Sequence, residues 1–190
     1  MMDNDRFAIV GDTAVSLSLL GTDGPILDLC AGGEGVIGQL MGDRVVAIDA
    51  SLEELKESPP GPLKIVMDAR KLQFLDGTFP SATCFFGLMY IPSEDLPAVF
   101  AEVFRVLAPG GEFHVWDCII PADPPAGKDV AVCRVRVRLA DREIVTGYGT
   151  LWPTGRRDAD CYAALARQAG FEILEVIEED GLVRVRARKP

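Results

Sequence analysis

Three aspartates lie in short apolar runs within residues 26–69 and could together bind a nucleoside. The runs are ILDLC (26–30), RVVAIDA (44–50) and LKIVMDA (63–69), and they carry Asp28, Asp49 and Asp68. A carboxylate accepts hydrogen bonds without donating any. Asp49 can therefore accept from both hydroxyls of a ribose and Asp68 from an exocyclic amine, while Asp28 can balance a cationic or amine-bearing group.

A glycine-rich loop follows the first aspartate in the stretch DLCAGGEGVIG (28–38). Its glycines let the backbone approach a ligand closely, because no Cβ stands in the way. GEGVIG also satisfies G-x-G-x-x-G, a pattern typical of dinucleotide-binding loops. Three carboxylates would repel a pyrophosphate, however, and Asp49 lies only 11 residues beyond Gly38, closer than that pattern expects. S-adenosylmethionine carries a sulfonium and an ammonium group and no phosphate, so we expect it as the cofactor.

The elements that must hold these residues alternate between apolar runs and helical patterns. We expect strands at 26–30, 44–50, 63–69, 81–90 and 112–120, and helices at 36–42, 51–57 and 93–111. In the second helix, Ser51 and Glu54 have the spacing of a capping box. The alternation predicts βαβ units, a parallel sheet and right-handed crossovers. Ligands of such sheets bind at the carboxyl ends of the strands, where the aspartates are expected.

The last third of the chain has a different pattern. Two apolar runs, 130–140 and 142–152, predict a β-hairpin after a proline-rich loop. A helix is expected at 157–170, and a closing hairpin at 171–179 and 182–189. We expect a single domain over residues 1–190, with a short N-terminal segment (1–25) and a hairpin insertion (121–156) that covers the acceptor pocket.

Composition excludes several classes of function. The net charge of −10 argues against nucleic acid as the main partner, because phosphate neutralisation needs a basic surface. Five cysteines without a C-x-x-C pair predict free thiols in a reducing compartment, and the single histidine argues against a metal site. The N-terminus has no secretory signal, and no apolar run reaches the ~18 residues of a membrane span. We therefore expect a cytoplasmic protein without a membrane partner.

The sequence resembles the class I S-adenosylmethionine-dependent methyltransferases, closest to the type 11 group that includes the ubiquinone/menaquinone-biosynthesis enzymes. Four motifs between Ile26 and Trp116 carry the resemblance: ILDLCAGGEG, VVAIDAS, IVMDARKLQF and FRVLAPGGEFHVWD. It implies a Rossmann-like, doubly wound α/β fold. Its seven-stranded sheet would have the order 3-2-1-4-5-7-6 with strand seven antiparallel, and the hairpin would be added to it.

The resemblance also implies a set of cofactor contacts. Asp28 and the backbone of Ala31, Gly32, Gly33 and Gly35 would line the methionine part. The ribose would meet Asp49 beside Ala50, the adenine would meet Asp68 and Ala69, and the methionine amine would meet the backbone around Phe86 and Gly87. The chain departs from the family pattern at Cys30, which replaces the first glycine of a loop that is also one residue longer.

Three residues are candidates for the acceptor side. Tyr90 follows the fourth strand in GLMYIPSED, Asp117 ends the fifth strand, and Tyr148 lies near Trp152 in the second arm of the hairpin. Tyr90 and Tyr148 could line the pocket, and Asp117 could act as a base, although each could instead serve packing. The alternating Arg134, Arg136 and Arg138 could form a solvated strand face or a site for an anionic acceptor.

The function that these observations favour is methyl transfer to a small-molecule acceptor, by a protein that could act as a homodimer. One alternative is a catalytically silent nucleotide-binding protein, in which the fold is kept and the acceptor pocket is lost. A second is an NAD-dependent oxidoreductase using GEGVIG. It is less supported, because no Tyr-x-x-x-Lys motif follows the fourth strand.

Overall fold

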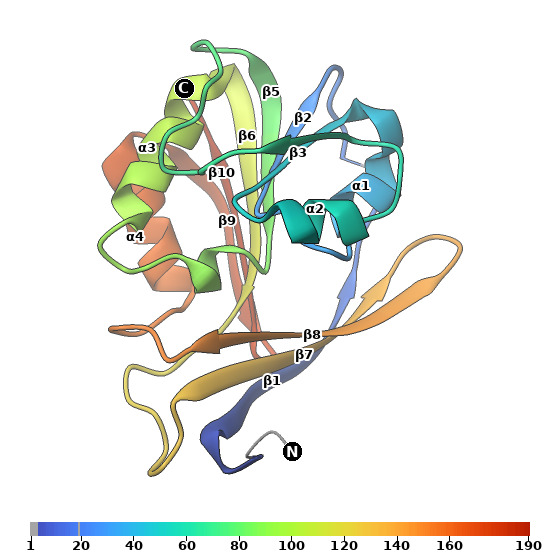
Figure 1. Ribbon diagram of the computed structural model, residues 1–190. Coiled ribbons are helices and arrows are strands. Elements are labelled where there is room, and N and C mark those ends of the chain that lie inside the picture. The colour runs from blue at the N-terminus through green and yellow to red at the C-terminus, as the bar shows by residue number, and fades with distance from the viewer. Residues whose placement is uncertain (1–3, 19) are drawn as a thin grey trace.

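The main sheet of the protein has seven strands in the order β4-β3-β2-β5-β6-β10-β9 (Figure 1). The computed structural model describes residues 4–18 and 20–190. The strands are β2 (Ile26–Leu29), β3 (Val45–Asp49), β4 (Leu63–Val66), β5 (Phe79–Phe85), β6 (Leu107–Cys118), β9 (Glu172–Glu179) and β10 (Leu182–Arg188). Strand β10 is antiparallel to both neighbours, and the other pairs are parallel. Counted along the chain, this order is 3-2-1-4-5-7-6, the order that the family resemblance implies.

Helices cover both faces of this sheet, which makes it doubly wound. The helices are α1 (Val36–Met41), α2 (Leu52–Glu57), α3 (Leu96–Val106) and α4 (Ala159–Ala169), with single 3₁₀ turns η1 (Asn4–Arg6), η2 (Gly42–Arg44) and η3 (Leu88–Tyr90). Neighbouring residues of β2 enter different cores: Leu27 packs with α3 and α4, and Ile26 packs with α1. This alternation follows from side chains pointing to opposite faces of a strand.

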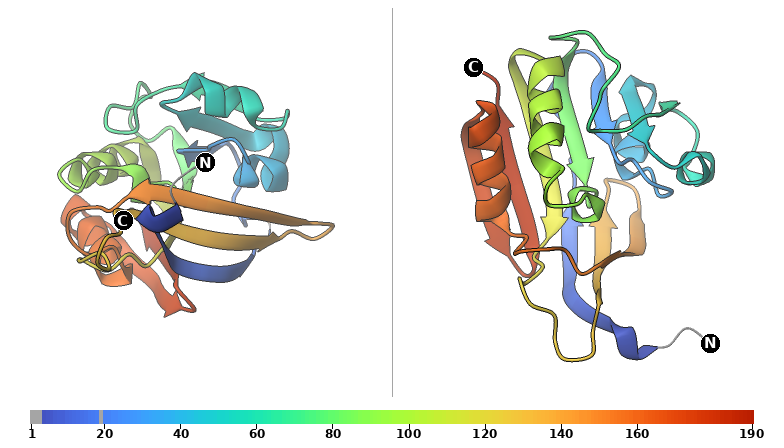
Figure 2. Two further views of the ribbon diagram at one scale, coloured as in Figure 1. Left: turned by 60° about the horizontal axis from the view of Figure 1, so that its bottom comes forward. Right: turned by 60° about the vertical axis from the view of Figure 1, so that its left-hand side comes forward.

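A second, three-stranded sheet lies across the carboxyl ends of the main strands (Figures 1 and 2). It consists of β1 (Phe7–Ser16), β7 (Val130–Arg138) and β8 (Glu143–Leu151), in the order β1-β7-β8. The predicted hairpin is present as the antiparallel pair of β7 and β8. Val15, Val135 and Val137 anchor the sheet in the same core as α1.

The N-terminal strand β1 differs from the short segment that the sequence predicts for residues 1–25. It pairs in parallel with β7, more than 100 residues later, with a register shift between Ile9 and Gly11. Gly11 and Asp12 interrupt the apolar alternation, so the sequence pattern alone does not reveal a strand there. Residues 1–3 and 19 of the predicted segment lie outside the described residues.

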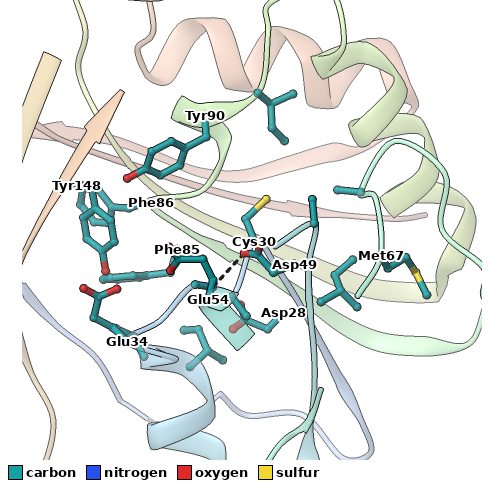
Figure 3. A pocket seen from close by; sticks show the side chains of 18 of the residues that line it. Asp28, Cys30, Glu34, Asp49, Glu54, Met67, Phe85, Phe86, Tyr90 and Tyr148 are labelled. Atoms are coloured by element: carbon teal, nitrogen blue, oxygen red, sulfur yellow. Dashed lines mark hydrogen bonds between the residues drawn. The ribbon is translucent and has the colours of Figure 1, made fainter. Parts of the chain in front are cut away.

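Several element boundaries also differ from those predicted. Helix α3 ends at Val106, and β6 begins at once, with its register to β5 shifting between Phe79 and Ser81. The fourth strand ends at Phe85, because Phe86 adopts a left-handed φ of 51° that a strand cannot continue. The following η3 turn carries Tyr90 toward the small sheet (Figure 3).

Candidate cofactor and acceptor site

A cavity of about 670 Å³ lies where the carboxyl ends of the parallel strands meet β8. Figure 3 shows its two ends: Asp49 and Met67 at one side, and Glu34, Phe86, Tyr90 and Tyr148 at the other. Ten predicted site residues line it: Asp28, Ala31, Gly32, Asp49, Ala50, Asp68, Ala69, Phe86, Tyr90 and Tyr148. The carboxyl-end location is the one expected for ligands of an open α/β sheet.

Two carboxylates hold the glycine loop from the side of β3 and α2. The Asp49 carboxylate accepts hydrogen bonds from the Gly32 N–H at 3.1 Å and the Ser51 N–H at 2.8 Å. The Glu54 carboxylate accepts from the Gly33 N–H at 2.8 Å. These backbone donors would be the natural partners of a phosphate, so the loop presents bound carboxylates where a pyrophosphate would need free N–H groups.

The predicted capping box is only half formed. The Ser51 hydroxyl accepts from the Glu54 N–H at 3.3 Å and caps α2 as expected. The Glu54 side chain, however, reaches the glycine loop instead of the Ser51 N–H, which Asp49 already satisfies. Helix α2 therefore contributes both a cap and a contact that fixes the loop.

Cys30 occupies a backbone conformation that normally favours glycine. Its φ is 52°, in the left-handed region, where a residue with a Cβ loses roughly 1–2 kcal/mol. Its side chain packs against Gly87, where an added Cβ would lie 2.5 Å from the Cys30 Cβ and 2.8 Å from the Cys84 Sγ. Gly87 is therefore required by packing and does not itself line the cavity.

The remaining two loop glycines also face away from the cavity. A Cβ at Gly33 would lie 3.1 Å from the Glu54 carboxylate, and one at Gly35 would lie 3.1 Å from the Ser58 Cβ. Neither lines the cavity. They allow the loop to pass close to α2 and the chain that follows it, so their role is to position Ala31 and Gly32.

Asp28 is a buried carboxylate at the centre of the cavity. Its side chain is 2% exposed and accepts a hydrogen bond from the Thr83 hydroxyl at 2.7 Å. Burial raises its pKa to about 7, a shift that the Thr83 hydrogen bond opposes and that the nearby Asp49 charge increases. A carboxyl group that titrates near neutrality is sensitive to any cation placed beside it.

Arg70 binds the carboxylate that was predicted to meet adenine. Its guanidinium donates to both Asp68 oxygens, at 2.7 Å to Oδ2, and it also donates to the Asp95 carboxylate at 2.7 Å. These hydrogen bonds hold the pKa of Asp68 below its usual value. Arg70 and Asp95 both line the cavity, and only Arg70 has a sequence signal, its position two residues after Asp68.

Aromatic side chains form the opposite end of the cavity. The rings of Phe86 and Tyr148 stack with centroids 5.0 Å apart and an interplanar angle of 11°. Tyr90 points toward Tyr148 from η3 (Figure 3), and its hydroxyl interacts with the backbone of Gly149. Trp152 does not line the cavity, because its indole N–H donates to the Pro121 carbonyl at 2.8 Å.

Glu34 joins this aromatic end and was not predicted from sequence. It lies in the glycine loop and accepts a hydrogen bond from the Thr146 hydroxyl of β8. The two residues are 112 positions apart in the chain, so nothing in the local pattern could reveal the contact. The bond links the glycine loop to β8, which lines the cavity through Gly147, Tyr148 and Gly149.

Asp117 lies outside the cavity, in a buried polar cluster. It is 0% exposed and accepts from the Cys118 N–H at 2.8 Å, the Met89 N–H at 3.0 Å and the Tyr162 hydroxyl at 3.2 Å. Burial raises its pKa to about 7, partly offset by these bonds and by the positive charge of Arg157. The position therefore gives Asp117 a structural role and no access to a reacting atom.

Replacing Asp117 by alanine is expected to destabilise the protein by about 3 kcal/mol and to leave ligand affinity unchanged. The change removes the acceptor of three buried donors and the counter-charge of Arg157, which is 1% exposed. Urea unfolding measures the loss, with exposed Asp123→Ala as the matched control. If the variant were as stable as wild type but inactive, Asp117 would instead take part in catalysis.

Comparisons with known proteins agree with this geometry. Residues 27–115 match the family model described as a methyltransferase domain. A sterol 4-C-methyltransferase of Caenorhabditis elegans is 44% identical over 55 residues, covering 29% of this chain and 16% of the relative. The ubiquinone/menaquinone biosynthesis C-methyltransferase UbiE of Desulfotalea psychrophila is 46% identical over 57 residues, covering 30% of this chain and 22% of the relative. The matches thus span less than a quarter of either relative.

The PH0226 protein of Pyrococcus horikoshii OT3 shares the fold in a solved structure. Its TM-score is 0.62 at 21% identity, with 89% of this chain and 83% of that chain covered. The sheet order and the carboxyl-end cavity define the class I methyltransferase fold. Residues 27–115, a little under half of the chain, match the methyltransferase-domain family model, and the sheet order is the one that the resemblance to class I S-adenosylmethionine-dependent methyltransferases implies.

Among the described residues, no helix combines the length and apolar character needed to cross a membrane.

Proposed function

We propose that the protein transfers the methyl group of S-adenosylmethionine to a small-molecule acceptor. The observation that carries the proposal is the acidic cavity at the strand ends, in which the N–H groups of Gly32 and Gly33 already bind carboxylates. Such a site accommodates a cationic nucleoside and disfavours a pyrophosphate. The same observation counts against the NAD-dependent alternative.

The cofactor fits the donors and acceptors along the cavity. Asp49 would accept from the ribose hydroxyls, next to Ala50, and the Asp68–Arg70 pair would meet the adenine edge beside Ala69. Asp28 would lie near the methionine ammonium, where a positive charge would favour its ionised form. When bound, the cofactor supplies an electrophilic methyl group on a sulfonium.

The contribution of the chain to such a transfer is positioning and exclusion of water. The glycine loop, fixed by Asp49 and Glu54, orients the ligand, and β8 covers the cavity through Tyr148. Holding two reactants in line removes much of the entropic barrier to a displacement reaction. A general base is needed only for an acceptor that must lose a proton.

Thermal shift with four ligands tests the choice of cofactor. S-adenosylmethionine and S-adenosylhomocysteine are expected to raise the melting temperature, because a ligand that binds only the native state stabilises it. NAD and NADP are expected to leave it unchanged. A response to NAD alone would overturn the proposal, whereas S-adenosylhomocysteine binding without turnover on any acceptor would favour the catalytically silent alternative.

The cellular setting is part of the same proposal. All five cysteines are free, which supports a reducing compartment such as the cytoplasm. The homodimer stays a prediction that sedimentation of the purified protein would test.

A further inference from the structure

We propose that the acceptor is an amine carried on an apolar or aromatic body, which binds as a cation between Glu34 and the aromatic end of the cavity. This inference rests on the proposed function, because it names the substrate class of the same site. It follows from the ring geometry and from the charges that line the cavity, and the raised pKa values of the tyrosines there support it.

Aromatic rings gather at this end of the cavity, where they could contact a cation. Phe86 and Tyr148 stack as one wall, and Phe85 meets Tyr148 edge-on with centroids 6.4 Å apart. Tyr90 approaches from η3 (Figure 3) and is 49% exposed, so part of its side chain faces solvent. The faces of such rings attract ammonium groups, and the attraction strengthens when water is excluded.

The charge at this end is negative. Glu34 is the charged residue beside the rings, and its carboxylate uses one oxygen for the Thr146 hydroxyl, so the other is available to a ligand. Among the described residues that line the cavity, Arg70 is the only cation. It lies at the adenine end and is bound by Asp68 and Asp95.

The arginines of β7 do not change this balance. Arg134, Arg136 and Arg138 lie on the exposed face of the strand and none lines the cavity. Arg136 pairs with Asp12, and Arg138 pairs with Glu143. Among the described residues, the anionic-acceptor alternative therefore has no cation at the aromatic end of the cavity, and the solvated-face interpretation of these arginines is favoured.

The pKa values of two tyrosines reflect both the burial and the negative charges around the pocket. Burial raises the pKa of Tyr90 to about 12, with the negative charges of Asp117 and Glu34 adding to the shift. Burial also raises the pKa of Tyr148 well above its usual value, and Glu34 is the largest electrostatic contributor. The negative charges would favour a protonated amine over an ionised phenol or carboxylic acid, whereas burial by itself would oppose every charged form.

The reaction balances with the groups present. The bound ammonium gives a proton to the Glu34 carboxylate, which leaves a neutral amine. The nitrogen lone pair forms the bond to the methyl carbon while the carbon–sulfur bond breaks, and its electron pair stays on sulfur to give a thioether. The product is a methylated ammonium ion, and Glu34 then releases its proton to solvent.

Three probes with one phenyl ring and different charges test the proposal. Phenethylamine, 2-phenylethanol and 3-phenylpropionate are titrated calorimetrically into the free protein and into protein saturated with S-adenosylhomocysteine. Phenethylamine is expected to bind at least tenfold more tightly than 2-phenylethanol, and 3-phenylpropionate more weakly than both. Equal affinity for the three, or a preference for the alcohol or the carboxylate, overturns the proposal.

Glu34→Gln removes the negative charge of Glu34 and is expected to leave the fold unchanged. Glutamine keeps an acceptor for the Thr146 hydroxyl, so the loop and β8 are expected to stay joined. The variant is expected to bind phenethylamine about tenfold more weakly and 2-phenylethanol within twofold of wild type. Exposed Glu53→Gln on α2 is the matched control and is expected to behave as wild type. An unchanged amine affinity in Glu34→Gln overturns the role of Glu34.

Different results would overturn the proposed function and the amine proposal. If S-adenosylhomocysteine does not bind, the proposed function falls, while the preference for the amine is still decided on the free protein. If S-adenosylhomocysteine binds and the amine is not preferred, the cofactor assignment stands and the amine proposal falls.

Discussion

Asp49→Ala is expected to weaken binding of S-adenosylhomocysteine by about 100-fold, because the change removes the acceptor proposed for both ribose hydroxyls. Hydrogen bonds to a charged group contribute roughly 1.5–3 kcal/mol each, and 1.4 kcal/mol corresponds to a factor of ten. The same carboxylate holds the N–H groups of Gly32 and Ser51, so its loss also loosens the loop. Isothermal titration measures the affinity.

Glu54→Gln is the control that distinguishes a loosened loop from the loss of a ribose contact. Glu54 holds Gly33 as Asp49 holds Gly32, and glutamine retains an acceptor for that N–H. Its affinity is expected to stay within threefold of wild type. If Asp49→Ala also bound within threefold of wild type, the ribose would not lie at Asp49 and the orientation of the cofactor in the cavity would have to be reversed.

Asp28→Asn is expected to abolish the pH dependence of cofactor binding between pH 6 and 8. With a pKa of about 7, Asp28 is mostly protonated at pH 6 and mostly ionised at pH 8. Only the ionised form attracts the ligand ammonium, so wild-type affinity for S-adenosylhomocysteine should rise about tenfold over this range. The variant should bind weakly at both pH values, as titrations at pH 6, 7 and 8 would show.

Asp28→Asn is expected to weaken cofactor binding but to stabilise the free protein as the pH rises. The raised pKa means that the folded state holds a proton between about pH 4 and 7 that the unfolded state releases, so this carboxyl lowers stability as pH rises through that window. Asn keeps an acceptor for the Thr83 hydroxyl and does not titrate. Relative to wild type, Asp28→Asn should gain about 3 kcal/mol between pH 5 and pH 8. Urea unfolding of both proteins measures this gain. A difference in unfolding free energy between variant and wild type that is the same at pH 5 and pH 8 would contradict the assignment.

These two predictions concern residues that the sequence places correctly, because both depend on local pattern. Asp28 lies near the end of an apolar run that leads into the glycine-rich loop, and Asp49 lies near the end of a run that leads into Ser51, the N-cap of α2. Parallel strands bring their carboxyl ends to one edge, where Asp28 and Asp49 line the cavity. Asp117 also lies at a strand end but does not line the cavity, so strand position alone does not decide the outcome. The parallel sheet follows from the same alternation, and its strand order is what the family resemblance implies.

What the sequence by itself determined is therefore the main sheet and the acidic strand ends, and it favours S-adenosylmethionine as the cofactor. Only the tertiary structure decided the contacts that join distant segments. It paired β1 with β7, linked Glu34 to Thr146 across the cavity, stacked Phe86 on Tyr148, and buried Asp117 beneath Tyr162. The physical reason is that hydrophobic periodicity records which side of an element is buried, whereas the partner of each side chain depends on how whole sheets pack against one another.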